Sequence, residues 1–237
     1  MFKIGHRGAL GYAPENTLSS FKKALDLNVD MIELDVHLCK SGELVVIHDK
    51  KINRNTNKTG AVNEKKLEEL KKLDVGNGEK IPTLEEALIF INKKTIVNIE
   101  LKGENTGKPT AKIINDYIDN KNWESDDFLV SSALRNEIQI FSRKAPNIKI
   151  GLVVNCTFIG KIGCILKIPF GYLKFAKKIG AYSIHFSKRL IRKKYIKQSQ
   201  REGFKIFVWT INNKKNIELM KKNEVDGILS DYPDRLF

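Results

Sequence analysis

The sequence contains no apolar run that could cross a membrane as a helix. The longest candidate, residues 152–170, is interrupted by Lys161, Lys167 and Pro169, whereas a membrane helix needs about 20 mostly apolar residues. The first residues also lack a basic region followed by an apolar one, the pattern of a secretory signal. We therefore expect a soluble, cytoplasmic protein for which membrane association is not the default.

Cysteine is scarce as well. The chain has three cysteines, Cys39, Cys156 and Cys164, with no CxxC pair and no spacing typical of a zinc site. An odd number of widely spaced cysteines does not form a disulfide framework. We interpret them as reduced, mostly buried thiols, as is usual in a reducing compartment.

Acidic residues are few beside the basic ones. The chain has 28 Asp and Glu against 42 Lys and Arg, a formal net charge of +14. The lysines are scattered, and the sequence shows no zinc finger, RNP motif or interleaved basic and aromatic residues. We therefore predict no nucleic-acid partner and interpret the charge as a lysine-rich surface, with attraction of phosphate as a side effect.

Short β-branched segments alternate with amphipathic ones along the whole chain. The predicted strands are Phe2–Gly5, Met31–Leu38, Leu44–His48, Thr95–Leu101, Phe128–Ser131, Lys149–Val154, Tyr182–Phe186, Lys205–Thr210 and Gly227–Ser230. The predicted helices are Asn16–Leu27, Lys65–Leu73, Thr83–Asn92, Thr110–Asn120, Arg135–Lys144, Leu190–Glu202 and Lys214–Asn223. About eight such repeats favour an α/β fold of the TIM (β/α)8 barrel type, with a doubly wound open sheet as the alternative. Nine strands for eight places leave one accessory strand, and we expect it to be the last.

One connection is longer than the others. Between the third predicted strand and the helix at Thr83, the chain has a polar stretch, a charged helix and a Gly76-Asn77-Gly78 turn. Thr83-Leu84-Glu85-Glu86 is a capping box that begins the next helix. We predict a single catalytic barrel domain over residues 1–237, with residues 49–82 as a small insertion after the third strand.

Residues capable of chemistry lie at the ends of successive predicted strands, where barrel active sites are found. The first strand ends in His6-Arg7, the second carries Glu33 and Asp35, the third ends in His48, and the fourth carries Glu100 and Lys102. Residues two apart on a strand face the same side. Any one of these motifs alone is more often a rim pair or a turn, so the argument depends on their coincidence.

Together these side chains indicate phosphodiester cleavage. Carboxylates that converge in a barrel mouth repel one another unless a cation neutralises them, and oxygen ligands suit a hard ion such as Mg²⁺ or Ca²⁺. Arg7 and Lys102 supply positive charge for a phosphate, and the two histidines titrate where an acid and a base are useful. Trp209, at the end of its strand, fits a core residue and a wall for the substrate about equally well.

The same motifs give a resemblance to a known family. His6-Arg7-Gly8, Pro14-Glu15-Asn16-Thr17, Glu33-Leu34-Asp35-Val36, His48-Asp49, Asn98-Ile99-Glu100-Leu101-Lys102, Val208-Trp209-Thr210-Ile211-Asn212 and Asp226-Gly227-Ile228-Leu229-Ser230-Asp231-Tyr232-Pro233 resemble the glycerophosphodiester phosphodiesterase family, in its order. The loop that follows His48-Asp49 departs from the family's Leu-x-Arg-Thr-Thr, since it reads Ile52-Asn53-Arg54-Asn55-Thr56. Arg54 is kept, but substrate choice through the insertion becomes less predictable.

The resemblance implies roles for individual residues. Glu33, Asp35 and Glu100 would hold one divalent metal ion, Mg²⁺ or Ca²⁺, and His6 and His48 would form the acid–base pair. Arg7 and Lys102 would bind phosphate, and Trp209 would line the glycerol pocket.

The implied reaction is metal-dependent hydrolysis of a small-molecule glycerophosphodiester to sn-glycerol 3-phosphate and an alcohol. One alternative is a lysophospholipase D at a membrane surface, for which the lysine-rich residues 156–181 would be an amphipathic contact rather than a barrel helix and its loop, the interpretation we prefer. An alternative of another class is a non-catalytic basic binding protein.

Overall fold

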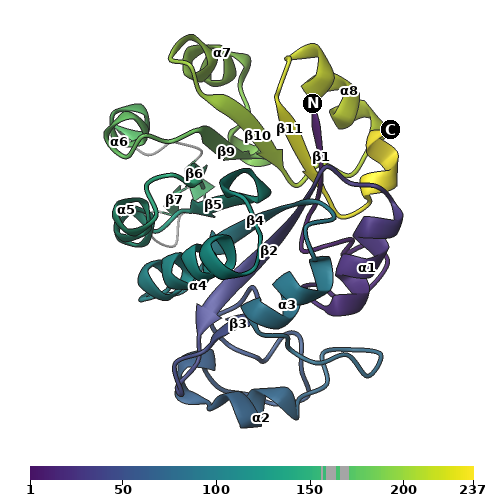
Figure 1. Ribbon diagram of the computed structural model, residues 1–237. Coiled ribbons are helices and arrows are strands. Elements are labelled where there is room, and N and C mark those ends of the chain that lie inside the picture. Colours follow the sequence, from purple (N-terminus) through teal and green to yellow (C-terminus); the bar gives the residue numbers. More distant parts are fainter. Residues whose placement is uncertain (156, 159–163, 166–170) are drawn as a thin grey trace.

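Eight parallel strands form a closed barrel in the computed structural model, which describes residues 1–155, 157–158, 164–165 and 171–237. Each strand pairs with its neighbours, and β1 pairs with both β11 and β2, which closes the ring (Figure 1). The closure confirms the predicted TIM barrel over the open doubly wound sheet. The strands are β1 (Phe2–Gly5), β2 (Met31–Leu38), β4 (Ile96–Leu101), β5 (Phe128–Ser132), β6 (Lys149–Val154), β9 (Ser183–Ser187), β10 (Lys205–Trp209) and β11 (Gly227–Ser230).

The accessory strand is not the last one, so that prediction was wrong. Gly227–Ser230 is β11 and lies between β1 and β10 in the barrel. The accessory strand is β3 (Leu44–Val46), which pairs antiparallel with the end of β2, Val36 opposite Val46. The short connection between β2 and β3 allows a hairpin, whereas a parallel crossover requires about a dozen residues or more.

Helices alternate with the barrel strands: α1 (Leu18–Asp26), α3 (Leu84–Ile91), α4 (Gly107–Asn120), α5 (Arg135–Lys144), α6 (Tyr172–Lys178), α7 (Lys193–Arg201) and α8 (Lys214–Lys222). Shorter elements are η2 (Ser125–Asp127), η3 (Lys188–Leu190), η4 (Pro233–Leu236) and the pair β7 (Thr157–Phe158) and β8 (Cys164–Ile165). Within the described residues, no helix is both long and apolar enough to span a bilayer.

Helices α1 and α3 each begin with a side-chain cap, and the cap of α3 is the predicted one. The Thr17 side chain accepts a hydrogen bond from the Ser20 backbone N–H at the start of α1. At α3, Thr83 accepts from the Glu86 N–H while the Glu86 carboxylate accepts from the Thr83 N–H, which is the predicted capping box. Helix α6 confirms a helix within residues 156–181, and residues 156, 159–163 and 166–170 of that segment lie outside the described residues.

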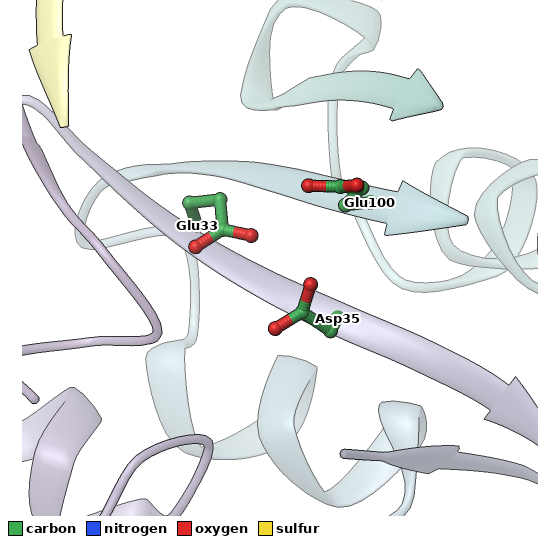
Figure 2. Close-up of side chains that lie close together, drawn as sticks. All are labelled: Glu33, Asp35 and Glu100. Atoms are coloured by element: carbon green, nitrogen blue, oxygen red, sulfur yellow. The ribbon is translucent and has the colours of Figure 1, made fainter. Parts of the chain in front are cut away.

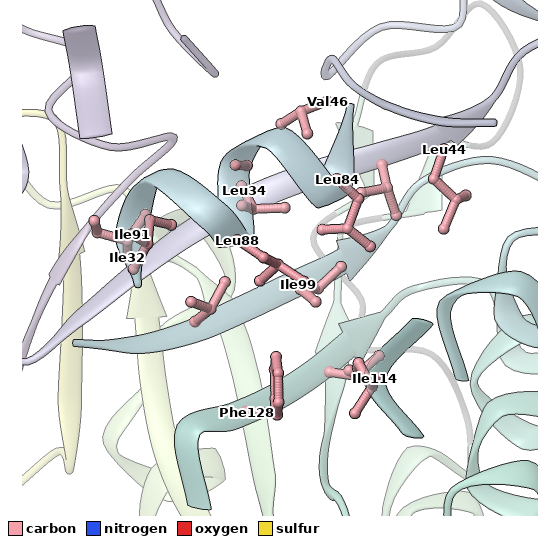
Figure 3. Close-up of a cluster of buried hydrophobic side chains, with 14 of the residues drawn as sticks. Ile32, Leu34, Leu44, Val46, Leu84, Leu88, Ile91, Ile99, Ile114 and Phe128 are labelled. Carbon is pink, nitrogen blue, oxygen red and sulfur yellow. The ribbon is translucent and has the colours of Figure 1, made fainter. Parts of the chain in front are cut away.

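The core lies between the strands and the surrounding helices. Leu34 on β2, Ile99 on β4 and Leu88 on α3 are fully buried in one apolar cluster (Figure 3). Leu34 lies between Glu33 and Asp35 on β2, and Ile99 directly precedes Glu100 on β4, so the acidic side chains face the barrel interior. Burying side chains of this kind stabilises the fold by roughly 1.5–3 kcal/mol each, and this layer fixes the strands that carry the polar groups.

The barrel interior changes from apolar to polar along the strands. Ile4, Met31, Leu129, Phe207 and Leu229 form an apolar cluster inside the barrel. Further along the same faces come the residues of the predicted site, because every second side chain of a strand points inward. The apolar layer closes one end of the barrel and leaves the charged layer at the carboxyl end of the strands.

Residues 49–82 form the connection between β3 and α3, with η1 (Val62–Glu64) and α2 (Leu67–Lys71). Ile52, Val62 and Leu70 pack with Ile47 in a separate apolar cluster. The base of this segment is closed because the Val46 N–H donates to the Pro82 carbonyl at 2.8 Å. Figure 1 shows the segment beyond the arrowhead of β2, at the carboxyl end of the barrel.

Candidate active site

Three carboxylates meet inside the carboxyl end of the barrel. Glu33 and Asp35 lie on β2, and Glu100 lies on β4 directly opposite Asp35. One oxygen from each lies within 4.8 Å of the others, and Figure 2 shows the three groups pointing into the same space. Glu33 and Asp35 are each about 1% exposed. The structure thus brings together all three residues that the sequence predicted as metal ligands.

The electrostatics of this cluster favour a bound cation. Burial, together with the charges of Asp35 and Glu100, raises the pKa of Glu33 well above its ordinary value. Burial and Asp35 also raise the pKa of Glu100. Burial acts in the same direction on Asp35, but Arg7 and Lys102 outweigh it and lower that pKa. Three oxygen donors that cannot all be charged on their own fit a hard divalent ion, which would remove the repulsion.

Arg7 and Lys102 lie beside these carboxylates. The Lys102 Nζ is 3.2 Å from the Glu100 Oε1 and 4.0 Å from the Asp35 Oδ1. The Arg7 Nε is 3.4 Å from the Asp35 Oδ2. It is buried, yet it has no hydrogen-bond partner within the described part of the chain. A buried guanidinium donor of this kind is costly unless it has an acceptor, and it is therefore available to an anionic ligand.

The backbone at Arg7 is held in an uncommon conformation. Its φ is 51°, in the left-handed region, and its N–H donates to the Glu33 Oε2 at 2.8 Å. Gly8 follows with φ +86°, and a Cβ there would lie 2.4 Å from the Ser20 hydroxyl. The close turn requires a glycine at this position, which explains the third residue of the His6-Arg7-Gly8 motif.

His6 is oriented by a carboxylate at the opposite end of the chain. Its Nδ1 lies 2.6 Å from the Asp231 Oδ1, and the Asn212 amide donates to the Asp231 Oδ2 at 2.6 Å. Burial would raise the pKa of Asp231, but the hydrogen bond from His6 lowers it, so that the group is a carboxylate acceptor. In the neutral form of the ring, the proton is therefore on Nδ1 and the lone pair is on Nε2.

His48 is held in the same way. Its Nδ1 lies 2.5 Å from the Asp49 Oδ1, and the Arg54 Nε donates to the Asp49 Oδ2 at 2.7 Å. The bond from Arg54 lowers the pKa of Asp49 to about 2. Burial lowers the pKa of His48 itself. His37, in phase with Asp35, donates its Nε2–H to the His48 carbonyl at 3.1 Å and so fixes the backbone there.

Several residues of the site were not assigned a role from the sequence. Glu15 accepts from Arg7 at 2.9 Å and from both terminal nitrogens of Arg54 at 2.9 and 2.7 Å. Asn16 donates to the Asp35 Oδ2 at 2.9 Å. Asp49, Asp231 and Asn212 also belong to this group. Asp231 directly follows β11, so its position at a strand end was the available signal, whereas Glu15 and Asn16 lie in a loop that strand phase does not place.

Two further residues that point toward the barrel interior, Trp209 and His185, differ in their relation to the site. Trp209, at the end of β10, packs beside the apolar interior cluster, and its buried Nε1–H has no acceptor within the described residues. His185 on β9 is 2% exposed and shares a 2.8 Å hydrogen bond with the Ser183 hydroxyl. Burial lowers its pKa to about 3. His185 is therefore a neutral core residue and not part of the acidic cluster.

Comparisons with known proteins agree on one family. The model of the Glycerophosphoryl diester phosphodiesterase family matches residues 6–235. The chain is 37% identical over 246 residues to a glycerophosphodiester phosphodiesterase of Caldanaerobacter subterraneus subsp. tengcongensis, covering 98% of this chain and 95% of that protein. A lysophospholipase D of Mus musculus is 26% identical, over 98% of this chain and 84% of that protein.

The fold has a similar solved structure. An Oleispira antarctica phosphodiesterase in complex with the product sn-glycerol-3-phosphate superposes with a TM-score of 0.86 at 27% identity. The match covers 98% of this chain and 94% of that chain. The similarity therefore extends over the barrel and the site together.

Proposed function

The chain belongs to the glycerophosphoryl diester phosphodiesterase family, and on this premise we propose which of its residues hydrolyse the glycerophosphodiester. The reaction cleaves one phosphodiester bond and, in our proposal, releases an alcohol and sn-glycerol 3-phosphate, the product bound in the Oleispira antarctica structure. The observation that carries the proposal is the meeting of three carboxylates, two cationic side chains and two oriented histidines at one end of the barrel.

Glu33, Asp35 and Glu100 would hold one divalent ion, Mg²⁺ or Ca²⁺. The support is the close approach of their oxygens and the raised pKa values of Glu33 and Glu100. When bound, such an ion withdraws electron density from the phosphate and offsets the charge that develops there. Asn16 keeps the Asp35 carboxylate turned toward the cluster through its 2.9 Å hydrogen bond.

Arg7 and Lys102 would bind the phosphate oxygens. Both are cationic at neutral pH, and each lies beside the carboxylates rather than in solvent. The buried Arg7 Nε has no hydrogen-bond acceptor within the described residues, so its N–H can donate to a phosphate oxygen. Glu15 holds another nitrogen of the same guanidinium, so the side chain is positioned before the substrate arrives.

His6 and His48 would act as the proton-transfer pair through their Nε2 atoms. Each ring directs its Nδ1 to a carboxylate, Asp231 or Asp49. That contact fixes the tautomer and stabilises the ring when it becomes positively charged. One histidine accepts a proton from the attacking oxygen, which belongs to water or to the neighbouring glycerol hydroxyl. The other donates a proton to the alcohol oxygen as its bond to phosphorus breaks. If the glycerol hydroxyl attacks, water then opens the cyclic phosphate.

Trp209 would line the glycerol side of the substrate. Its ring packs against the apolar interior cluster. Its Nε1–H has no acceptor within the described residues, and a glycerol hydroxyl would supply one. Residues 49–82 would form the wall on the other side, as an insertion within one catalytic domain. Asp49 and Arg54 support this because they connect the insertion to His48 and Glu15.

The enzyme assignment rules against the non-catalytic binding protein. The lysophospholipase D alternative uses the same catalytic groups and differs in the apolar chain that the pocket must accept. The mouse relative of that name is less similar than the phosphodiesterase of Caldanaerobacter. Cleavage restricted to water-soluble diesters would exclude the alternative, and release of choline from lysophosphatidylcholine vesicles would support it.

The first test measures glycerol 3-phosphate release from glycerophosphocholine and glycerophosphoethanolamine with Mg²⁺, Ca²⁺ or EDTA. We expect release by the wild type with a metal ion, and loss of at least about 10²-fold in His6→Ala and Glu33→Gln. Glu68→Gln is the matched control, because Glu68 is an exposed carboxylate of α2. Undiminished activity in EDTA or in Glu33→Gln would contradict the metal assignment.

A second test separates the two histidines. A substrate whose leaving group is p-nitrophenol needs little protonation, so the variant that lacks the acid regains activity on it. The variant that lacks the base does not. We therefore expect His6→Ala and His48→Ala to differ in the ratio of rates on the p-nitrophenyl ester and on glycerophosphocholine. Equal ratios would contradict the division into one acid and one base.

A further inference from the structure

A cavity of about 420 Å³ lies beside the acidic cluster. Its volume is within the range of small-molecule sites, about 300–1,000 Å³. The barrel contributes His37 from β2 and Gly103 from the end of β4, and residues 49–82 contribute Lys50 and Lys51. Lys40, in the turn after β2, also lines it. We call it the basic cavity.

The basic cavity adjoins the proposed site through its lining residue His37, whose Nε2–H donates to the His48 carbonyl at 3.1 Å. His37 lies two residues beyond Asp35 on the same face of β2, which places it roughly 7 Å further along the strand. Gly103 directly follows Lys102, and Lys50 is two residues beyond His48. A phosphodiester centred on Arg7 and Lys102 would therefore lie near enough to extend one of its two arms toward this space.

The other arm is directed to a different side of the barrel. Trp209, the proposed glycerol wall, lies on β10, which is separated from β2 by β1 and β11. The two arms of the substrate thus diverge, with glycerol near β10 and the leaving alcohol near the insertion. The side chains that line the basic cavity then determine which alcohol binds.

The charge of the cavity is strongly positive. Lys40, Lys50 and Lys51 are exposed, and no carboxylate lies within 4.0 Å of their Nζ atoms among the residues that the structure describes. Lys71, in the same insertion, is by contrast paired with Glu86. Glu104 is the one carboxylate among the described lining residues. The lining therefore has an excess of two positive charges from its Lys and Glu residues.

The neighbouring helix does not contribute to anion binding. The N–H groups of Asn105 and Gly107, at the start of α4, already donate to the Glu137 carboxylate at 2.9 and 2.8 Å. The lining also contains no Phe, Tyr or Trp among the described residues. Aromatic faces are the usual means of binding a quaternary ammonium group such as choline, and the lysines would repel it.

We infer that the basic cavity binds the leaving alcohol and selects an alcohol that carries an anionic group, such as a phosphate. This inference depends on the proposed function and narrows its substrate class. The anionic group would lie between Lys40 of the turn after β2 and the two lysines of the insertion, Lys50 and Lys51. Glycerophosphodiesters with a phosphorylated alcohol are then better substrates than those of choline or ethanolamine.

The test uses two substrates that differ by one phosphate, glycerophosphoglycerol and glycerophosphoglycerol 3′-phosphate. For the wild type we expect kcat/KM to be about tenfold higher for the phosphorylated substrate, the size expected for a few exposed charge pairs. The preference falls as salt rises from about 0.05 to about 0.5 M, because such pairs are screened. In the triple variant Lys40→Gln, Lys50→Gln, Lys51→Gln the ratio of the two kcat/KM values approaches one.

A matched triple variant controls for net charge. Lys58→Gln, Lys72→Gln and Lys94→Gln remove the same three charges from positions outside the cavity, and the substrate ratio stays at its wild-type value. Equal kcat/KM values for both substrates in the wild type, or the same fall of the ratio in both triple variants, would overturn the inference. Absence of cleavage of every glycerophosphodiester would instead overturn the proposed function.

Discussion

Replacing Asp231 with asparagine exchanges one carboxylate oxygen for an NH₂ group and is expected to reverse the tautomer of His6. The Asn212 amide nitrogen donates to the Asp231 Oδ2 at 2.6 Å. The Asn212 Oδ1 accepts from the Ser230 hydroxyl and from the Asp231 N–H, each at 3.0 Å. The orientation of the Asn212 amide is therefore fixed. The introduced asparagine must direct its side-chain oxygen to Asn212 and its NH₂ group to the His6 Nδ1.

The Nδ1 atom would then accept a hydrogen bond, and the proton of the neutral ring would move to Nε2. Without a lone pair at Nε2 the ring cannot take up a proton there, which His6 must do whether it acts as the base or becomes the positively charged acid. Loss of general acid–base catalysis by one group lowers the rate by about 10²–10⁴-fold. We expect a fall of this size in kcat for Asp231→Asn, with little change in KM, because the phosphate contacts of Arg7 and Lys102 remain.

An exchange of the two side chains provides the decisive control. In the double variant Asp231→Asn, Asn212→Asp, the new carboxylate at position 212 accepts from Ser230, from the backbone and from the NH₂ group of the introduced asparagine. The side-chain oxygen at position 231 then faces the His6 Nδ1–H, as the carboxylate does in the wild type. We expect kcat to recover by at least about tenfold over the single variant, with the tautomer followed by ¹⁵N NMR of the ring. A double variant no faster than the single one, with both folded, would refute the reasoning.

Further predictions concern the metal, pH and the glycerol wall. Saturating Mg²⁺ or Ca²⁺ is expected to raise the melting temperature by about 5–10 °C, as binding at about 100 times Kd contributes about 2.7 kcal/mol; a Glu33→Gln, Glu100→Gln variant shows no such rise by calorimetry. Burial would raise the pKa of Glu15, but the bonds from Arg54 and Arg7 lower it to about 2. The stabilisation by Glu15 is therefore complete above its ordinary pKa of 4.5 and is lost toward pH 2. Glu15→Gln lowers the free energy of unfolding in urea by about 1–2 kcal/mol at about pH 7 and by less at about pH 3. Trp209→Phe, which removes the Nε1–H and keeps an aromatic ring, raises KM for glycerophosphoglycerol about three- to tenfold at nearly constant kcat, measured by initial rates.

Strand and helix periodicity predicted the barrel because each segment follows its own period. Met31–Leu38 and Lys149–Val154 are strands over the predicted residues, and Arg135–Lys144 is the predicted helix. Phase along β2 and β4 also predicted that Glu33, Asp35 and Glu100 face one another. These features depend on neighbouring residues and on one repeated rule, the inward direction of every second side chain.

Two features were not predicted, the antiparallel pairing of β3 and the contact of Glu15 with the insertion. The sequence pattern of Leu44–Val46 suits any buried strand, and only its short connection to β2 distinguishes the antiparallel hairpin from a barrel strand. Glu15 lies in a loop, and its pairing with Arg54 of the insertion depends on how the insertion folds over the barrel mouth. Periodicity carries no information on such a pairing, because neither residue belongs to a regular element.

The pairing of β1 with β11 also has a consequence for the order of events during synthesis. His6 leaves the ribosome early, whereas Asp231 is 225 residues further along the chain. Until Asp231 has left the ribosome, the nascent chain has the acidic residues of β2 and β4, but its His6 lacks the carboxylate that orients the ring. We therefore expect activity to begin only after the last strand has joined the first.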